Sequence, residues 1–167
     1  MRARALTLAL LLALLLALGC GRSWDLDQPM RVSVVSRELS AVAIAGYFES
    51  AVKQLGGTVS PLADQVVYVR YNAAADCNGC TPLTIEHVGY RDDTIQILPR
   101  IMAAPADALD HAIAHGLGHV LGFEQHLPAG RRGVMMGRYD DVPAPKTRYT
   151  PDDFTALRSS RAFGGRL

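Results

Sequence analysis

Two histidines four residues apart, His115 and His119, are the residues of this chain whose type and spacing best suit chemistry. Residues i and i+4 of an α-helix lie on the same face, because 3.6 residues make one turn. Two imidazoles placed in this way can bind one zinc ion together. A further histidine, His126, follows and is a candidate third ligand. The spacing therefore predicts a zinc site built on a helix.

Residues 115–126 read HGLGHVLGFEQH. This segment resembles the zinc-binding helix of the metzincin metallopeptidases, whose motif is H-E-x-x-H-x-x-G-x-x-H. Two later segments resemble the matrixin branch of that family. Residues 133–139 are similar to its Met-turn, with Met135 the better match for the turn methionine and Met136 the alternative. Residues 149–154 are similar to the start of its C-terminal helix.

The resemblance implies an α+β fold of the metzincin, zincin-like type. In such a fold a twisted mixed β-sheet packs on helices, and a zinc-type helix, a Met-turn and a C-terminal helix form the site. The resemblance also implies Zn²⁺ as cofactor, hydrolysis of peptide bonds by a zinc-bound water, and a peptide or protein as substrate or ligand. In the family motif, the glutamate after the first histidine is the general base.

This chain departs from the motif at the general base, because Gly116 stands at the glutamate position. A glycine cannot move a proton, and losing a general base typically lowers a rate about 10²–10⁴-fold. We therefore assign no catalytic residue and expect a weak or inactive peptidase. Two alternatives remain open: a pseudoprotease that binds a peptide along the strand at residues 94–98 without cleaving it, and a purely structural envelope lipoprotein.

The third ligand is the second departure. Gln125 occupies the family position, and an amide oxygen is a poor zinc ligand compared with imidazole. His126 lies one residue later, and a loop after the helix can absorb that shift. The predicted ligands are therefore His115, His119 and His126, with Gln125 as the alternative third position. His111 lies about 12 Å along the helix axis from His119, so we expect it to pack beside the site and not to bind the ion.

The N-terminal residues 1–19 resemble a secretory signal, with two arginines followed by a Leu/Ala run. The run ends in a Leu-Gly-Cys junction that resembles a bacterial lipobox. We expect lipidation of Cys20, a tether at residues 20–29 and a matrixin-like domain at residues 30–167. The protein would then be exported and lipid-anchored in a bacterial cell envelope; an ordinary cleaved signal, and hence a secreted protein, is the alternative.

Charge and cysteine content limit the other function classes. Without the two arginines of the signal, the chain has 15 basic residues and 16 acidic ones. This balance gives no electrostatic case for binding nucleic acid, and membrane contact would come through the lipid on Cys20. We expect a monomer. Cys77 and Cys80 favour a small disulfide in an exported protein; a redox pair or half a zinc knuckle is the alternative.

Hydrophobic periodicity and turn residues predict the elements that position these residues. A stripe of apolar residues at helical spacing predicts a helix that ends at the glycine pair following residue 55. The last helix is expected to begin at Pro151 with Thr150 as its cap. Strands are expected at residues 30–35, 66–71, 84–90 and 94–98, the last two forming a hairpin, and the other helices at residues 36–55 and 106–121.

Overall fold

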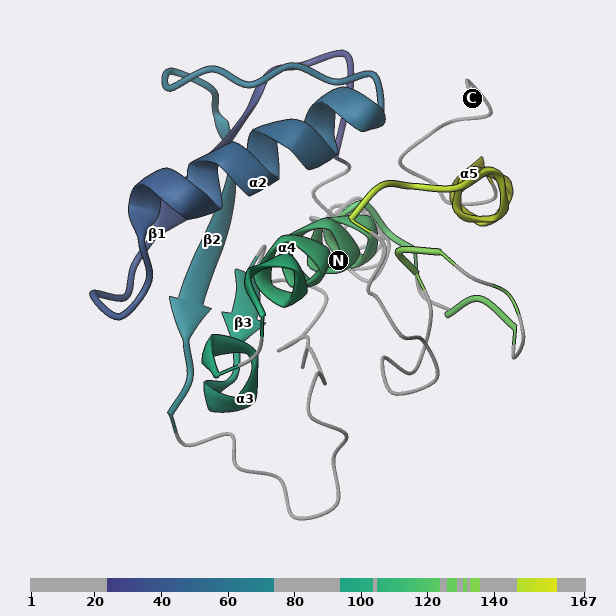
Figure 1. Cartoon of the computed structure of the whole chain (residues 1–167). Helices are drawn as coiled ribbons and strands as arrows, with labels where there is room; N and C mark the ends of the chain where they lie inside the picture. Colours follow the sequence, from purple (N-terminus) through teal and green to yellow (C-terminus); the bar gives the residue numbers. More distant parts are fainter. Residues whose placement is uncertain are drawn as a thin grey trace, which may run out of the picture.

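The computed structural model describes residues 24–73, 94–103, 105–123, 126–128, 131, 133–135 and 147–158. These residues form an α+β structure, as expected (Figure 1). No helix among them is long and apolar enough to cross a bilayer. The elements, in chain order, are β1 (Met30–Val34), α2 (Ala41–Gln54), β2 (Gln65–Tyr71), β3 (Thr94–Ile97), α3 (Pro99–Met102), α4 (Ala106–Val120) and α5 (Pro151–Arg158).

Several expectations fall outside the described residues. These are the signal, the lipidation residue Cys20, the pair Cys77 and Cys80, and the strand at residues 84–90 with its hairpin. Residues 124, 125 and 136, which include two of the alternatives for the site, are outside them as well.

The described sheet has three strands in the order β1-β2-β3, and both pairs are parallel. A mixed sheet was expected, and the strand at residues 84–90 that would run antiparallel to β3 lies outside the described residues, so this part of the prediction stays a prediction. Parallel neighbours need a crossover connection, and α2 supplies it between β1 and β2. In Figure 1, α2 lies over β1 and β2 and α4 lies over β3, with the two helices in contact.

The core lies between this face of the sheet and the two helices. Successive side chains of a strand point to opposite faces, so Ile95 and Ile97 of β3 both turn toward the helices and are fully buried. Ile113 and Leu117 of α4 meet them from the helix side with no exposed surface. Because the histidines stand on the same helix, this packing fixes the position of the site.

Helix α2 begins later than expected, at Ala41 instead of residue 36. Ser40 caps it, accepting a hydrogen bond from the Ala43 amide at 3.4 Å. The Ser36 hydroxyl accepts from the backbone amide of Tyr71 at 2.8 Å instead, which ties the loop before the helix to the end of β2. The end agrees with expectation, since Gly56 has a φ of 82° and terminates the helix.

Residues 24–29, expected as part of a tether, pack on the domain. Trp24 is only 9% exposed, and Leu26 contacts the core. The Asp25 amide donates to Gln65 Oε1 at 2.8 Å, and Gln65 Nε2 donates back to the Asp25 carbonyl at 2.8 Å. Residues packed on the domain are thus found as close as four positions after Cys20.

Candidate metal centre

Helix α4 presents His115 and His119 on one face, one turn apart. Their ring centroids are 4.7 Å apart and their Nε2 atoms 2.9 Å apart. His115 is buried and His119 is half-buried. The helical spacing thus brings two ring nitrogens to one point, as the sequence predicted.

Backbone carbonyls fix which nitrogen of each ring carries the proton. Nδ1 of His115 donates to the Val134 carbonyl at 2.7 Å, and Nδ1 of His119 donates to the Phe123 carbonyl at 2.5 Å. A carbonyl can only accept, so in the neutral rings both Nε2 atoms carry lone pairs. Two lone pairs facing each other at 2.9 Å repel unless a metal ion or a shared proton lies between them. The arrangement therefore suits a shared metal ion.

The turn at the end of α4 places the Phe123 carbonyl. Gly122 has a φ of 94°, a conformation that glycine adopts without steric cost. Its amide donates to the His119 carbonyl at 2.8 Å, and the Phe123 amide donates to the Gly118 carbonyl at 3.0 Å. These are the two bonds of a Schellman motif. The turn folds the chain back so that Phe123 can orient the imidazole of His119.

His126 completes a group of three. Its ring centroid lies 5.2 Å from that of His115 and 5.1 Å from that of His119. One ligand nitrogen from each residue lies within 4.8 Å of the other two. His115, His119 and His126 can therefore hold a metal ion, with His126 on the solvent side.

The charge state of the group also suits a cation. Burial is the main cause that lowers the pKa of His115 well below its usual value, and the neighbouring His119 and His111 lower it further. The hydrogen bond to Val134 opposes this shift without reversing it. Burial also lowers the pKa of His126. Both rings are thus neutral at pH 7, the form that binds metals.

The segment that resembles a Met-turn packs directly against α4. Met135 is fully buried, and a Cβ on Gly118 would overlap its Sδ atom. Gly118 stands between the two histidines in sequence, so only a residue without a side chain lets Met135 approach the helix here. The Leu127 amide donates to the Met135 carbonyl at 2.7 Å, which ties the loop carrying His126 to the same turn.

A buried carboxylate orders this turn. Asp153 is fully buried, and its two oxygens accept from the amides of Val134 at 2.9 Å and Met135 at 2.8 Å. It also accepts from the amide and hydroxyl of Thr150, at 2.7 and 2.8 Å. Since the Val134 carbonyl accepts from Nδ1 of His115, Asp153 fixes the peptide that orients this ligand.

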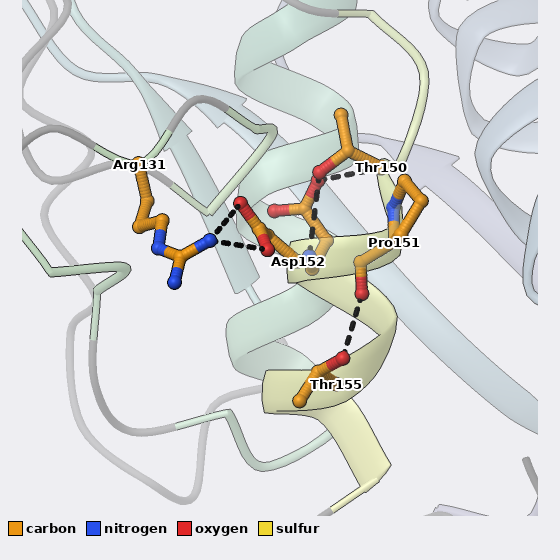
Figure 2. Close-up of polar contacts among 6 residues, drawn as sticks. Arg131, Thr150, Pro151, Asp152 and Thr155 are labelled. Atoms are coloured by element: carbon orange, nitrogen blue, oxygen red, sulfur yellow. Dashed lines mark hydrogen bonds and ion pairs between the residues drawn. The ribbon is translucent and has the colours of Figure 1, made fainter.

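The neighbouring Asp152 has a different environment, which the sequence alone did not separate from that of Asp153. Figure 2 shows its carboxylate paired with Arg131, at 3.2 and 3.4 Å, on an exposed surface. The available signal was the spacing of Thr150 and Asp153, which is that of a reciprocal helix cap. The Thr150 hydroxyl does accept from the Asp153 amide at 3.4 Å, so the same carboxylate serves the cap and the turn.

Two further contacts frame the helix. The hydroxyl of Tyr149 donates to the Ala114 carbonyl at 2.6 Å, and burial raises the pKa of this phenol. His111 is 5% exposed, with its ring centroid 5.7 Å from that of His115. It is not a member of the three-histidine group, which agrees with the packing role expected for it.

The helix face at Gly116 is closed by a strand. A Cβ built on Gly116 would lie 2.8 Å from Cγ2 and 2.9 Å from Cγ1 of Ile95. Real Cβ atoms do not show such contacts, so a larger residue at position 116 would force the Ile95 side chain or the strand to move. The position that the family uses for its base thus lacks a carboxylate, and a carboxylate there would displace Ile95.

The chain matches no family model and no curated protein sequence.

Proposed function

We propose that this protein is an exported, matrixin-like metallopeptidase domain that binds Zn²⁺ through His115, His119 and His126 and has little or no peptidase activity. The observation that carries the proposal is the pair of Nε2 atoms turned toward each other by two backbone carbonyls. Partners that orient ligating histidines in this way are typical of metal sites.

The donor set supports zinc in particular. Three neutral imidazoles suit a tetrahedral zinc ion with one open position. Two nitrogens bound to one such ion lie about 3.3 Å apart, close to the 2.9 Å between the Nε2 atoms of His115 and His119. His126 would have to approach by about 1.5 Å, given the 4.8 Å span of the group. Its side chain is exposed and can turn toward the other two rings without disturbing the core.

A bound zinc ion would supply Lewis-acid chemistry at its open position. Peptide hydrolysis also needs a group that takes a proton from the attacking water and passes it to the leaving amine. Gly116 cannot do this, and Ile95 fills the space beside it. Low turnover is therefore expected for two reasons: the carboxylate is missing, and the contact between α4 and β3 fills the space where it would lie.

The test is a peptidase assay on an unfolded protein substrate with zinc present. Wild type should show little or no cleavage. The side chain of Gly116→Glu would clash with Ile95, so this change is combined with Ile95→Ala. The double variant should cleave the substrate about 10²–10⁴-fold faster than wild type if the new carboxylate reaches the site.

The matched control is Ile95→Ala with Gly116→Gln, which has the same shape without the base and should remain inactive. Robust, chelator-sensitive cleavage by the wild-type protein would contradict the proposed inactivity. Failure of the folded wild-type protein to bind zinc would contradict the proposed metal site.

Binding of a peptide without cleavage is the second candidate. Among the described residues β3 is the last strand of the sheet, and an extended peptide can add to such a strand. A peptide that binds the zinc-loaded protein and is recovered intact would favour this function; binding that survives removal of the metal would place it away from the centre.

We further propose that the mature chain is anchored to a bacterial membrane through a lipid on Cys20. The supporting observations are the charged start, the Leu/Ala run and the Leu-Gly-Cys junction. Mass spectrometry of the purified protein tests this directly, because a lipidated Cys20 would be the new N-terminal residue.

A further inference from the structure

The loop between α2 and β2 exposes apolar side chains at its tip, residues 59–62. Leu62 is 90% exposed and Val59 is 36% exposed, and Pro61, between them, is also exposed. Covering a leucine that is almost entirely exposed to water with another apolar phase lowers the free energy. The tip is thus a candidate surface for contact with an apolar partner.

The N-terminal segment of the domain is fixed to this loop. The Met30 amide donates to the Thr58 carbonyl, and the Ser60 amide donates to the Met30 carbonyl, both at 2.9 Å. Leu26 packs against the loop at Gly57. In Figure 1 residues 24–29 and the loop run together along the top of the molecule, whereas α4 lies below α2.

The number of residues before Trp24 limits how far this end can be from an anchor at Cys20. Trp24 lies four positions after Cys20, and a fully extended chain spans at most about 3.6 Å per position. Trp24 can therefore lie no more than about 14 Å from Cys20. Because Trp24 is packed into the domain, the domain cannot move away on a long spacer.

We propose that the loop tip at residues 59–62 inserts into the outer part of the lipid bilayer to which Cys20 is anchored. The inference rests on the proposed lipidation. The short connection keeps the end of the domain that carries Leu62 against the bilayer, and the interfacial region accepts apolar side chains at shallow depth. The tip then sets the orientation of the domain and directs α4 away from the lipid.

The charges around the tip define the lipid chemistry. Asp25, Asp27 and Asp64 are exposed on the same segment and loop. Arg31 brings a cation to the loop, where its Nε donates to the Ala63 carbonyl at 2.9 Å, but the acidic groups are in excess, so an anionic surface would repel this end of the domain. The contact therefore depends on apolar burial and suits a zwitterionic bilayer. It should be insensitive to salt, unlike contacts made by basic residues.

The test uses the full-length protein, processed and purified with its lipid, in phosphatidylcholine vesicles whose acyl chains carry bromine. Bromine quenches tryptophan fluorescence only at close range. Leu62→Trp is compared with Val42→Trp, both in a Trp24→Phe background. Val42 is the matched control, because it is 86% exposed and apolar but lies at the start of α2, away from the loop.

We expect brominated lipid to reduce the emission of the Leu62→Trp protein at least twofold and to leave that of Val42→Trp unchanged, at low and at high salt. Equal quenching of the two variants, or quenching of neither, would overturn the proposal. Mass spectrometry of the same sample separates the two failures: an unmodified Cys20 removes the anchoring and the insertion together, whereas a lipidated protein without quenching at Leu62 removes the insertion alone.

Discussion

At the scale of single residues, the proposed metal centre depends on groups that would not touch the ion. His115 and His119 present their Nε2 atoms because Val134 and Phe123 occupy the Nδ1 positions. Partners of this kind fix ring orientation and raise ligand basicity, and their loss typically costs 10–100-fold in metal affinity. Asp153 acts one step further out, through the peptide that joins Val134 to Met135, whose amide donates to Asp153 Oδ1.

Asp153→Asn should therefore lower zinc affinity by about 10-fold, at the low end of that range. Asparagine keeps the shape but offers one accepting oxygen where two backbone amides need one each. Competition with a chromophoric chelator at pH 7 measures the affinity. The control is Asp152→Asn, which changes an exposed carboxylate paired with Arg131 and should leave the affinity unchanged. Equal affinities in two folded variants would refute the positioning role.

The choice between the two candidates for the third ligand is also a question about single residues. His126→Ala should weaken zinc binding at least 10-fold, because imidazole is a strong zinc ligand. Gln125→Ala should have no effect on it. Titration of both variants with zinc distinguishes the two residues. A loss of zinc affinity confined to the Gln125 variant would show that Gln125, and not His126, is the third ligand.

At the scale of elements, glycines decide how closely α4 meets its neighbours. Gly116→Ala gains roughly 1 kcal/mol in helix propensity but forces overpacking against Ile95, which typically costs 1–3 kcal/mol. The net change should lower the free energy of unfolding by about 1 kcal/mol. Gly46→Ala, in α2 with nothing within 4 Å of the added Cβ, should raise it by roughly 1 kcal/mol.

Chemical denaturation of the metal-free proteins measures both changes. If Gly116→Ala stabilised the protein as much as Gly46→Ala does, the close contact between α4 and β3 would be refuted, and with it the explanation for the missing base.

The helix termini give a second matched pair. Gly122 and Gly56 both have positive φ and free space around an added Cβ, so alanine at either position should cost about 1 kcal/mol of stability. Only Gly122→Ala should also weaken zinc binding, because it moves the Phe123 carbonyl from Nδ1 of His119. A similar loss of zinc affinity in Gly56→Ala would mean that the effect is global destabilisation.

The elements were predicted to different degrees. Helix α4 followed from histidine spacing and apolar periodicity, and β2 and the start of α5 from strand and capping residues. The start of α2 was missed, because the hydroxyl of Ser36 bonds to Tyr71, far away in sequence. The contact of Gly116 with Ile95 could not be predicted from the sequence either, since it depends on the packing distance between a strand and a helix.

At the scale of the whole molecule, the buried histidine makes the metal-free fold sensitive to pH. The pKa of His115 is lowered in the folded state, so between that value and the usual 6.5 the unfolded chain binds more protons than the folded one. Stability therefore rises with pH in this window and falls as the pH drops below about 6.5. The same shift in His126 adds to the effect.

Thermal unfolding in the presence of a chelator should thus give a Tm that decreases from pH 7 to pH 5. With saturating zinc the decrease should begin at lower pH, because the ion competes with protons for the same nitrogens. A Tm that is constant over this range in the metal-free protein would contradict the buried, neutral state of His115.

The measurement that most directly tests the three-histidine zinc centre is the zinc content of the purified mature protein, prepared without chelators. It should be one ion per chain, and variants with alanine at His115 or His119 should lose it while remaining folded. A wild-type protein that takes up no zinc, or a protein that keeps its zinc when both histidines are replaced, would contradict the account.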